Sequence, residues 1–281
     1  MADNDLTTLP AVQDWLSTGN QAPSNSDSVL SRLITSVSGQ IMAYLQRSSF
    51  LSQTYNDVVS GRGSAIYFLD EWPVTEIVSL SVDGIAVPAS LNQGPGWVLS
   101  PWNGYPPGAP QQIRLLGGYT FARGDQNIAV SFQAGYLVSN EPGVIPSGAA
   151  PSILLAQPQG PMMRPESVTY ASTGIALTRV ASSPAAGQYA VATPTQQVPQ
   201  GTLLFNTADA SAAVLTSYSY VPSAVEAACV EWVAERFRYR SRMGQRSQSI
   251  GGQTSNSYDL SDIPAFVKLA LNPYRQVLPT S

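Results

Sequence analysis

Few residues in this sequence have the chemistry that catalysis needs. The 281 residues contain no histidine, which removes the Ser–His–Asp triad, the Cys–His dyad and histidine metal ligands. Carboxylates remain, and the nearest candidates are Asp70, Glu71 and Asp83. Asp70 and Glu71 end a predicted strand and Asp83 fills a predicted turn, so turn chemistry explains all three better than catalysis. We expect no catalytic residue and no enzyme. The enzyme alternative is a carboxylate-dependent glycan hydrolase, suggested by nearby aromatic side chains: Trp72, Trp97 and Trp102.

Cofactor motifs are also missing from the sequence. Neither a GxxxxGK[S/T] loop nor a GxGxxG loop occurs, and the single cysteine, Cys229, has no partner for a CxxC or Cys/His site. Cys229 lies on a predicted apolar helix stripe, where a buried structural thiol is expected. We therefore expect no cofactor and no bound metal.

A cluster of arginines with interleaved aromatic residues is the most informative chemical feature. Its members are Arg236, Arg238, Arg240, Arg242 and Arg246, with Phe237 and Tyr239 between them. On a helix, Arg238 and Arg242 lie near Glu231 and Glu235, as in a solvated face of ion pairs. Arg236 and Arg240 lie in line with the apolar stripe, so we expect them to contact a neighbouring subunit or a passing DNA. The net charge of −4 favours the subunit interface.

The composition favours a protein that is buried among partners. Only 11% of the residues are charged, whereas 43% are hydrophobic. Much of the surface must then consist of neutral polar side chains, although soluble monomers usually rely on charge. The N-terminus is acidic and polar, unlike a signal peptide, and no apolar run has the length of a membrane span. We therefore expect a protein that is made in a cytoplasm and does not contact a membrane.

The pattern of hydrophobic residues divides the chain into three regions and predicts the α+β class. Residues 1–48 and 221–281 have helical periodicity, and residues 49–220 have the pattern of strands and loops. The predicted helices are residues 9–16, 28–47, 223–243 and 262–271. Residues 245–259 are polar and rich in Gly and Ser, which predicts a mobile loop.

The strand region predicts two hairpins, further strands and an insertion. The hairpins pair residues 50–59 with 64–69, and residues 77–82 with 85–87 about Asp83-Gly84. Further strands are predicted at 97–99, 111–116 and 127–136. Residues 138–165 are rich in Pro, Gly and Ala, which predicts an extended arm. Five strand-like segments then predict a small all-β insertion: 168–171, 175–180, 189–192, 202–205 and 213–220.

The order of short motifs resembles the head–tail connector (adaptor) family of tailed bacteriophages. The resemblance covers about residues 5–136 and 219–278. Its motifs are Leu6-Thr7-Thr8-Leu9, Val12-x-x-Trp15-Leu16, Ser28-x-Leu30-x-x-Leu33-Ile34, Ile41-x-x-Tyr44-Leu45-x-Arg47-Ser48, Trp72-Pro73-Val74-Thr75, Val82-Asp83-Gly84, Ala134-Gly135-Tyr136, Val221-Pro222-x-x-Val225-Glu226-x-Ala228, Ala234-Glu235-Arg236-Phe237, Ile263-Pro264 and Pro273-Tyr274-Arg275. The compact form of the family runs from the Gly-Tyr strand end almost directly into the Pro-led helix. This chain departs from it between Tyr136 and Tyr220.

The resemblance implies a virion protein at the head–tail junction. It implies a helical core that forms a homo-oligomeric ring, usually of twelve subunits, beneath the portal protein and above a tail-side completion or tube protein. Double-stranded DNA would pass through without sequence-specific binding. The implied domains are a core part at 1–137, the inserted arm and β domain at 138–217, and a C-terminal helix, loop and tail at 218–281. The implied portal-docking residues are Ile263, Pro264, Phe266, Leu269, Pro273, Tyr274 and Arg275. The alternative within virion proteins is another tail or baseplate component.

Overall fold

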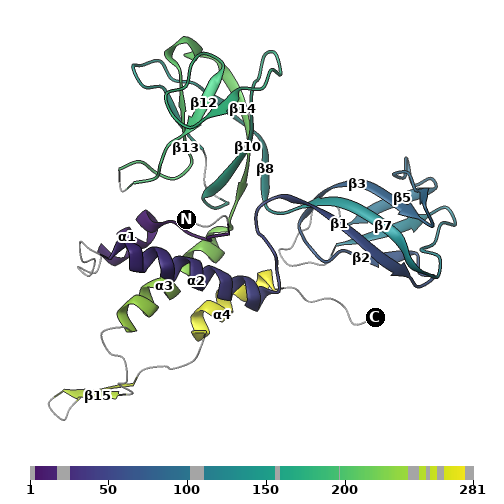
Figure 1. The fold of residues 1–281 in the computed structure, drawn as a ribbon, viewed down its shortest axis with the longest axis horizontal. Coiled ribbons are helices and arrows are strands. Elements are labelled where there is room, and N and C mark those ends of the chain that lie inside the picture. The colour runs from purple at the N-terminus through teal and green to yellow at the C-terminus, as the bar shows by residue number, and fades with distance from the viewer. Residues whose placement is uncertain are drawn as a thin grey trace.

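The structure, a computed structural model, describes residues 4–17, 26–101, 111–155, 159–195, 197–239, 247–250, 254–257 and 263–275. Within these ranges the fold is mixed α+β, as predicted. Buried hydrophobic side chains gather in three clusters, one among the helices and one in each of two groups of strands. The helical body lies at the corner from which two β lobes extend in different directions (Figure 1). None of the described helices is both long and apolar enough to cross a membrane.

The helical body combines both ends of the described chain around one central helix. Helix α3 contacts each of the other helices, and its buried side chains cover most of its circumference. These include the predicted stripe residues Val225, Cys229, Trp232 and Val233, so that prediction is confirmed. The elements of the body are α1 (Leu9–Ser17), α2 (Asp27–Leu45), α3 (Ser223–Tyr239), α4 (Ala265–Leu271) and the short 3-10 turn η3 (Asn272–Tyr274).

Helix α2 ends in a tight turn that aims the next residues into the body. Gln46 adopts a left-handed conformation, with φ of 57°, which stops the helix in the way that a glycine usually does. The backbone N–H of Arg47 then donates to the carbonyl of Met42 at 3.1 Å. Arg47 is therefore directed back toward the core instead of continuing along the helix axis.

The first lobe, residues 50–136, is a pair of antiparallel sheets packed face to face. One sheet has the order β1-β7-β3-β4 and the other β2-β6-β5. Alternate side chains of these strands meet in the core, including Leu80, Ile113 and Phe132, as the two-residue period of a strand requires. The strands are β1 (Gln53–Gly61), β2 (Ile66–Phe68), β3 (Val74–Val82), β4 (Ile85–Ala86), β5 (Gly96–Ser100), β6 (Gln112–Leu116) and β7 (Gly124–Ala134).

Of the two predicted hairpins, one is confirmed and one is wrong. Strands β3 and β4 pair about Asp83 and Gly84, whose φ values of 52° and 77° fit a type I′ turn. Strand β1 does not pair with β2. Instead β1 pairs with β7, and β2 pairs with β6 in the opposite sheet. The glycine-rich connection at 61–63 therefore carries the chain across the sandwich, which local sequence signals cannot distinguish from a hairpin turn.

The second lobe, residues 137–220, has its own core and its own pair of sheets. The sheets have the orders β10-β14-β8 and β11-β12-β13-β9, and they enclose side chains such as Leu203, Val214 and Tyr218. The strands are β8 (Leu137–Val144), β9 (Ser152–Leu154), β10 (Met162–Tyr170), β11 (Thr178–Val180), β12 (Gln188–Val191), β13 (Thr202–Phe205) and β14 (Ala213–Tyr220). A short 3-10 turn, η1 (Thr207–Asp209), precedes β14.

The prediction of an extended arm at residues 138–165 is wrong. Residues in this range form β8, β9 and the start of β10. Proline argues against a central strand because it lacks an N–H for the ladder. Here Pro142 and Pro165 lie in β8 and β10, the two edge strands of their sheet. The central strand β14 contains no proline, so the sheet tolerates both residues.

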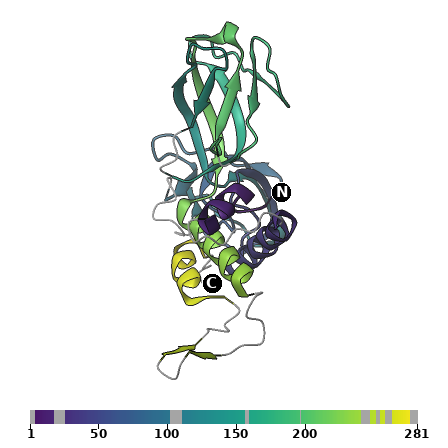
Figure 2. The ribbon, with the colours of Figure 1, turned by 90° about the vertical axis from the view of Figure 1, so that its left-hand side faces the viewer.

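The prediction of a mobile loop at residues 245–259 is wrong for two short segments. Strands β15 (Ser247–Ile250) and β16 (Thr254–Ser257) pair antiparallel as a hairpin. The rest of that range lies outside the described residues. In Figure 2 the hairpin lies at the end of the molecule opposite the second lobe.

Candidate functional site

The three parts of the molecule meet where the chain crosses between them. The chain enters the first lobe at Phe50, passes to the second lobe at Tyr136 and returns to the body at Tyr220. The N–H of Tyr136 donates to the carbonyl of Phe50 at 2.8 Å, and the N–H of Tyr220 donates to the carbonyl of Tyr136 at 3.1 Å. The ring of Tyr136 lies 5.8 Å from that of Phe50 and 5.7 Å from that of Tyr220. We call this cluster of crossing residues the junction.

Arg47 is the buried cation of the junction. The residue is 6% exposed, and its guanidinium lies 4.8, 4.7 and 5.5 Å from the ring centroids of Phe50, Trp72 and Tyr136. These distances are within the range of cation–π attraction. Its Nη2 donates to the carbonyl oxygen of Trp72, and its Nε lies 3.9 Å from a carboxylate oxygen of Glu71. Arg47 thus ties the end of α2 to the first lobe.

Several buried polar atoms of the junction have no hydrogen-bond partner among the described residues. They are Nε1 of Trp72 and Nε and Nη1 of Arg47, of which Nε makes only the long ion pair with Glu71. Burial raises the pKa of Tyr136 to about 12, although the charge of Arg47 and a hydrogen bond with it act in the opposite direction. Buried polar groups without partners cost free energy. The junction is therefore held by aromatic packing against an unfavourable polar contribution.

A second arginine ties the second lobe to the first. Arg164 on β10 donates to the carbonyl oxygen of Ser52, just before β1, and forms an ion pair with Glu166 at 2.9 Å. Ser219 on β14 donates to Glu166 and accepts from the N–H of Ser52 at 3.1 Å. Ser219 is fully buried, whereas the side chains of Arg164 and Glu166 are 42% and 32% exposed, so this small network lies at the edge of the contact between the lobes.

The C-terminal turn packs on the same junction. The ring of Tyr274 lies 6.3 Å from that of Phe50 and 6.2 Å from that of Tyr136. The hydroxyl of Tyr44 donates to Asn272 at 2.9 Å, and the guanidinium of Arg275 lies 5.4 Å from the ring of Tyr44. Tyr274 and Arg275, which the resemblance assigns to portal docking, therefore contact this chain's own body. Pro273, which directly precedes Tyr274, is exposed.

Helix α4 has one buried face and one exposed apolar face. Val267 and Leu271 are fully buried in the body. Phe266 is 47% exposed and Leu269 is 75% exposed, three residues apart and therefore on one side of the helix. Of the other predicted docking residues, Ile263 and Pro264 are half-buried at the start of α4. The docking role of all these residues stays a prediction.

The structure places two of the five clustered arginines. The Nη2 of Arg236 donates to the side-chain oxygen of Gln40 on α2 at 2.9 Å, and its guanidinium lies 5.3 Å from the ring of Trp232. Arg236 therefore closes the contact between α2 and α3 in this chain, whereas Arg238 is exposed. Arg240, Arg242 and Arg246 lie outside the described residues. The interface or DNA-channel role of the cluster stays a prediction.

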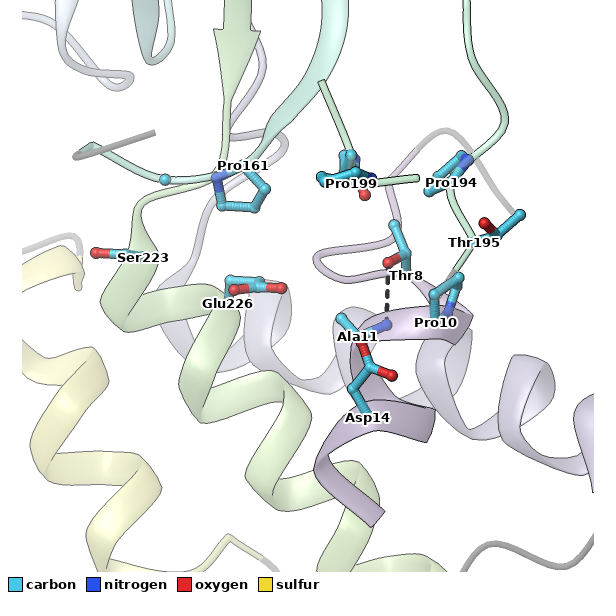
Figure 3. Close-up of a pocket in the computed structure, with 12 residues that line it drawn as sticks. Thr8, Pro10, Ala11, Asp14, Pro161, Pro194, Thr195, Pro199, Ser223 and Glu226 are labelled. Atoms are coloured by element: carbon cyan, nitrogen blue, oxygen red, sulfur yellow. Dashed lines mark hydrogen bonds between the residues drawn. The ribbon is translucent and has the colours of Figure 1, made fainter. Parts of the chain in front are cut away.

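A polar cleft of about 270 Å³ lies between α1, the start of α3 and the second lobe. Figure 3 shows Glu226 from α3 and Asp14 from α1 facing a rim that contains Pro161, Pro194 and Pro199. Burial raises the pKa of Glu226, and a hydrogen bond from Thr7 at 3.1 Å partly offsets this effect.

The carboxylates of the enzyme alternative have structural partners. Glu71 accepts from the N–H of Ser48 at 3.1 Å and from its hydroxyl at 2.8 Å, in addition to its contact with Arg47. Asp83 lies in the β3–β4 turn and accepts from the side-chain amide of Asn127 at 2.9 Å. Trp102 lies outside the described residues. Glu71 and Asp83 thus have structural contacts within this chain, and the enzyme alternative stays a prediction.

Sequence reasoning missed the junction. Arg47 belongs to one quoted motif, Tyr136 to another and Tyr274 to a third, but their spacing in the sequence gives no reason to bring them together. One signal was present: Arg47 directly follows the apolar stripe of α2 and precedes Phe50 in a chain with few charges.

Comparisons with known proteins give a likeness in structure and none in sequence. No family model matches the chain, and no curated protein matches it. One solved structure, described as the neck of an empty GTA particle computed with C6 symmetry, matches with 12% identity and a TM-score of 0.40. The match covers 99% of this chain and 96% of that chain.

Proposed function

We propose that this chain is a structural virion protein of a tailed bacteriophage, the head–tail connector or adaptor. In this role copies of the chain form an oligomeric ring under the portal, continue the DNA channel and join the head to the tail. The proposal is based on the ordered set of motifs at 5–136 and 219–278. A structural observation between Tyr136 and Tyr220, where the chain differs from the compact form of the family, also supports the proposal.

That observation is the hydrogen bond of 3.1 Å between Tyr220 N–H and the Tyr136 carbonyl. The family's compact form runs from the Gly-Tyr strand end almost directly into the Pro-led helix. In this chain Tyr136 and Tyr220, the two ends of the inserted segment, are adjacent. The strands that begin and end the segment, β8 and β14, pair directly beside them, with Leu137 opposite Ser219. A unit whose ends are adjacent can be inserted without disturbing its host. The second lobe is therefore compatible with a connector whose core matches the compact form.

The two long helices, α2 and α3, supply the core of the ring subunit in this proposal, and α4 supplies the portal-docking surface through Phe266 and Leu269. Exposed apolar side chains on one helix face are suited to insertion in a partner's groove. The exposed Arg238 contacts a neighbouring subunit or the DNA channel, and DNA passes without sequence-specific binding. We also propose that the chain has no enzymatic activity.

The test is cryo-electron microscopy of the purified protein mixed with its portal. The expected result is rings stacked coaxially on the portal, with twelve-fold symmetry in two-dimensional classes. Free monomers beside bare portals would reject the connector. The tail or baseplate alternative then predicts that antibody label on intact particles lies away from the head–tail junction.

A further inference from the structure

The C-terminal segment reaches back to the point where both lobes leave the body. Helix α4 anchors on the body through Val267 and Leu271. Turn η3 then places Tyr274 against Phe50 and Tyr136, at 6.3 and 6.2 Å between ring centroids. These are the residues at which the chain enters the first lobe and leaves it for the second. One side chain at the end of the described chain thus covers both crossings.

Few contacts hold turn η3 in place, and all of them are local. It consists of the ring contacts of Tyr274, the hydrogen bond from Tyr44 to Asn272 at 2.9 Å and the stacking of Arg275 over Tyr44 at 5.4 Å. The outer face of α4, with Phe266 and Leu269, is exposed beside it. A partner can therefore bind α4 and draw the turn away without first opening the helical core.

We expect the packing of the junction to change when turn η3 moves away from it. Arg47 and Trp72 contain buried nitrogen atoms that lack hydrogen-bond partners among the described residues. Water would satisfy these atoms in an open junction, whereas the closed junction is stabilised by packing of aromatic rings. Two arrangements with opposing contributions are the requirement for a two-state element.

We propose that the C-terminal turn is a latch on the junction. With Tyr274 in place, the two β lobes are held in one orientation relative to the helical body. When a partner takes up the C-terminal segment, residues 263–275, Tyr274 withdraws, water reaches Arg47 and Tyr136, and the lobes reorient. The latch concerns a single chain and does not depend on the proposed connector role. Only its use during docking rests on that role.

The test measures distances between the parts in the isolated full chain, without portal. Spin labels are attached at exposed positions through Ser36→Cys in the body, Ser79→Cys in the first lobe and Ser172→Cys in the second lobe, taken in pairs. Native Cys229 is buried and its pKa is raised to about 12 by burial, so it does not compete for label. Pulsed electron paramagnetic resonance gives the distance distribution for each pair.

The latch variant is Tyr274→Ala, and the matched controls are Tyr274→Phe and Lys268→Ala. Tyr274→Ala should widen or shift the body-to-lobe distributions, because the cover over Phe50 and Tyr136 is lost. Tyr274→Phe keeps the ring, and Lys268→Ala changes only an exposed side chain of α4, so both should match the wild type. Wild-type distributions in a folded Tyr274→Ala protein would overturn the proposal.

A second variant covers the case in which Tyr274→Ala does not fold. Tyr44→Phe removes only the hydroxyl that holds Asn272. It should widen the same distributions by a smaller amount, and unchanged distributions would again reject the latch. Because no portal is present, neither result depends on whether the chain is a connector.

Discussion

At the scale of single residues, Arg47 decides how the end of α2 meets the first lobe. A guanidinium suits this position because it is planar and can stack on Phe50, Trp72 and Tyr136 while still donating to a carbonyl. The nearest carboxylate, on Glu71, is 3.9 Å away. The ion pair is therefore weak, and the contribution of Arg47 comes mainly from stacking and from its bond to Trp72.

Replacing Arg47 with lysine tests this interpretation. Lysine keeps the charge but not the planar surface, so the variant should lose about 1–2 kcal/mol of unfolding free energy, the range of a desolvated cation–π contact. Urea unfolding measures the change. Arg32→Lys is the matched control, since Arg32 lies exposed on the same helix, and it should be neutral. If Arg47→Lys is as stable as the wild type, charge alone is sufficient at this position.

Asp57 gives a prediction for pH dependence. Its carboxyl lies on the inner side of β1, and one of its oxygens is buried without a partner among the described residues. Burial raises the pKa of Asp57, and the charges of Asp70 and Glu71 raise it further. Between the ordinary pKa and the raised one, the folded protein binds more protons than the unfolded chain. Stability therefore falls as the pH rises through that window.

Asp57→Asn should remove this loss. The variant should melt at a higher temperature than the wild type at pH 7. Below the ordinary pKa of an aspartate, where both carboxyl and amide are neutral, the difference should vanish. Thermal unfolding followed by circular dichroism across this pH range checks the prediction. A variant that is less stable than the wild type at pH 7 would mean that the ionised carboxylate makes a favourable contact.

At the scale of elements, helix α4 has one face that stabilises the fold and an opposite face that is available for binding. Val267 and Leu271 pack in the body, whereas Leu269 is 75% exposed. Leu269→Ala should therefore change the unfolding free energy by less than about 0.5 kcal/mol. If α4 docks on the portal, burial of this side chain contributes about 1.5–3 kcal/mol. The variant should then bind the portal about tenfold to a hundredfold more weakly.

Binding of labelled protein to immobilised portal measures this effect, and Lys268→Ala is the control. Lys268 is exposed next to Leu269 and should matter much less for binding. Equal binding by wild type and Leu269→Ala would remove α4 from the docking surface.

The elements that the sequence predicts well are those whose signals are local. Helix α2 follows from its apolar stripe, and the β3–β4 hairpin follows from Asp83-Gly84, because both signals act within a few residues. The pairing of β1 and the strand nature of residues 138–144 were missed for a different reason. Strand β1 pairs with β7, and β8 pairs with β14, so the partner in each case is more than 60 residues away.

The candidate site was even less accessible to sequence reasoning. The family resemblance assigned Tyr274 and Arg275 to a partner, and the helix pattern assigned Arg236 to an interface. The structure gives all three residues contacts within the chain. An apolar stripe or a charge cluster predicts which residues are buried or make contacts. It does not predict whether the contacting surface belongs to the same chain or to a partner. The junction joins residues 47, 136, 220 and 274, and only the tertiary fold brings these positions together.

At the scale of the whole molecule, the two lobes are attached in different ways. The second lobe leaves and returns at Tyr136 and Tyr220, which are hydrogen-bonded to each other, and it has a separate hydrophobic core. The first lobe is also entered and left at adjacent residues, Phe50 and Tyr136. However, it supplies Trp72 and Glu71 to Arg47, so it completes a buried contact of the helical body.

This difference predicts opposite outcomes for two deletions. Replacing residues 138–218 with a short Gly-Ser linker should leave a folded protein, because the linker joins ends that are already adjacent and no partner of Arg47 is lost. Replacing residues 52–134 should destabilise the body strongly, because it removes Trp72 and leaves the buried guanidinium of Arg47 uncovered.

Circular dichroism and thermal unfolding distinguish the two deletions. Electron microscopy with the portal then shows whether the protein that lacks residues 138–218 still forms rings. A connector core in residues 1–137 and 218–281 requires that it does. A shortened protein that folds but forms no rings would place the ring contacts in the second lobe, and one that fails to fold would show that this lobe is part of the body.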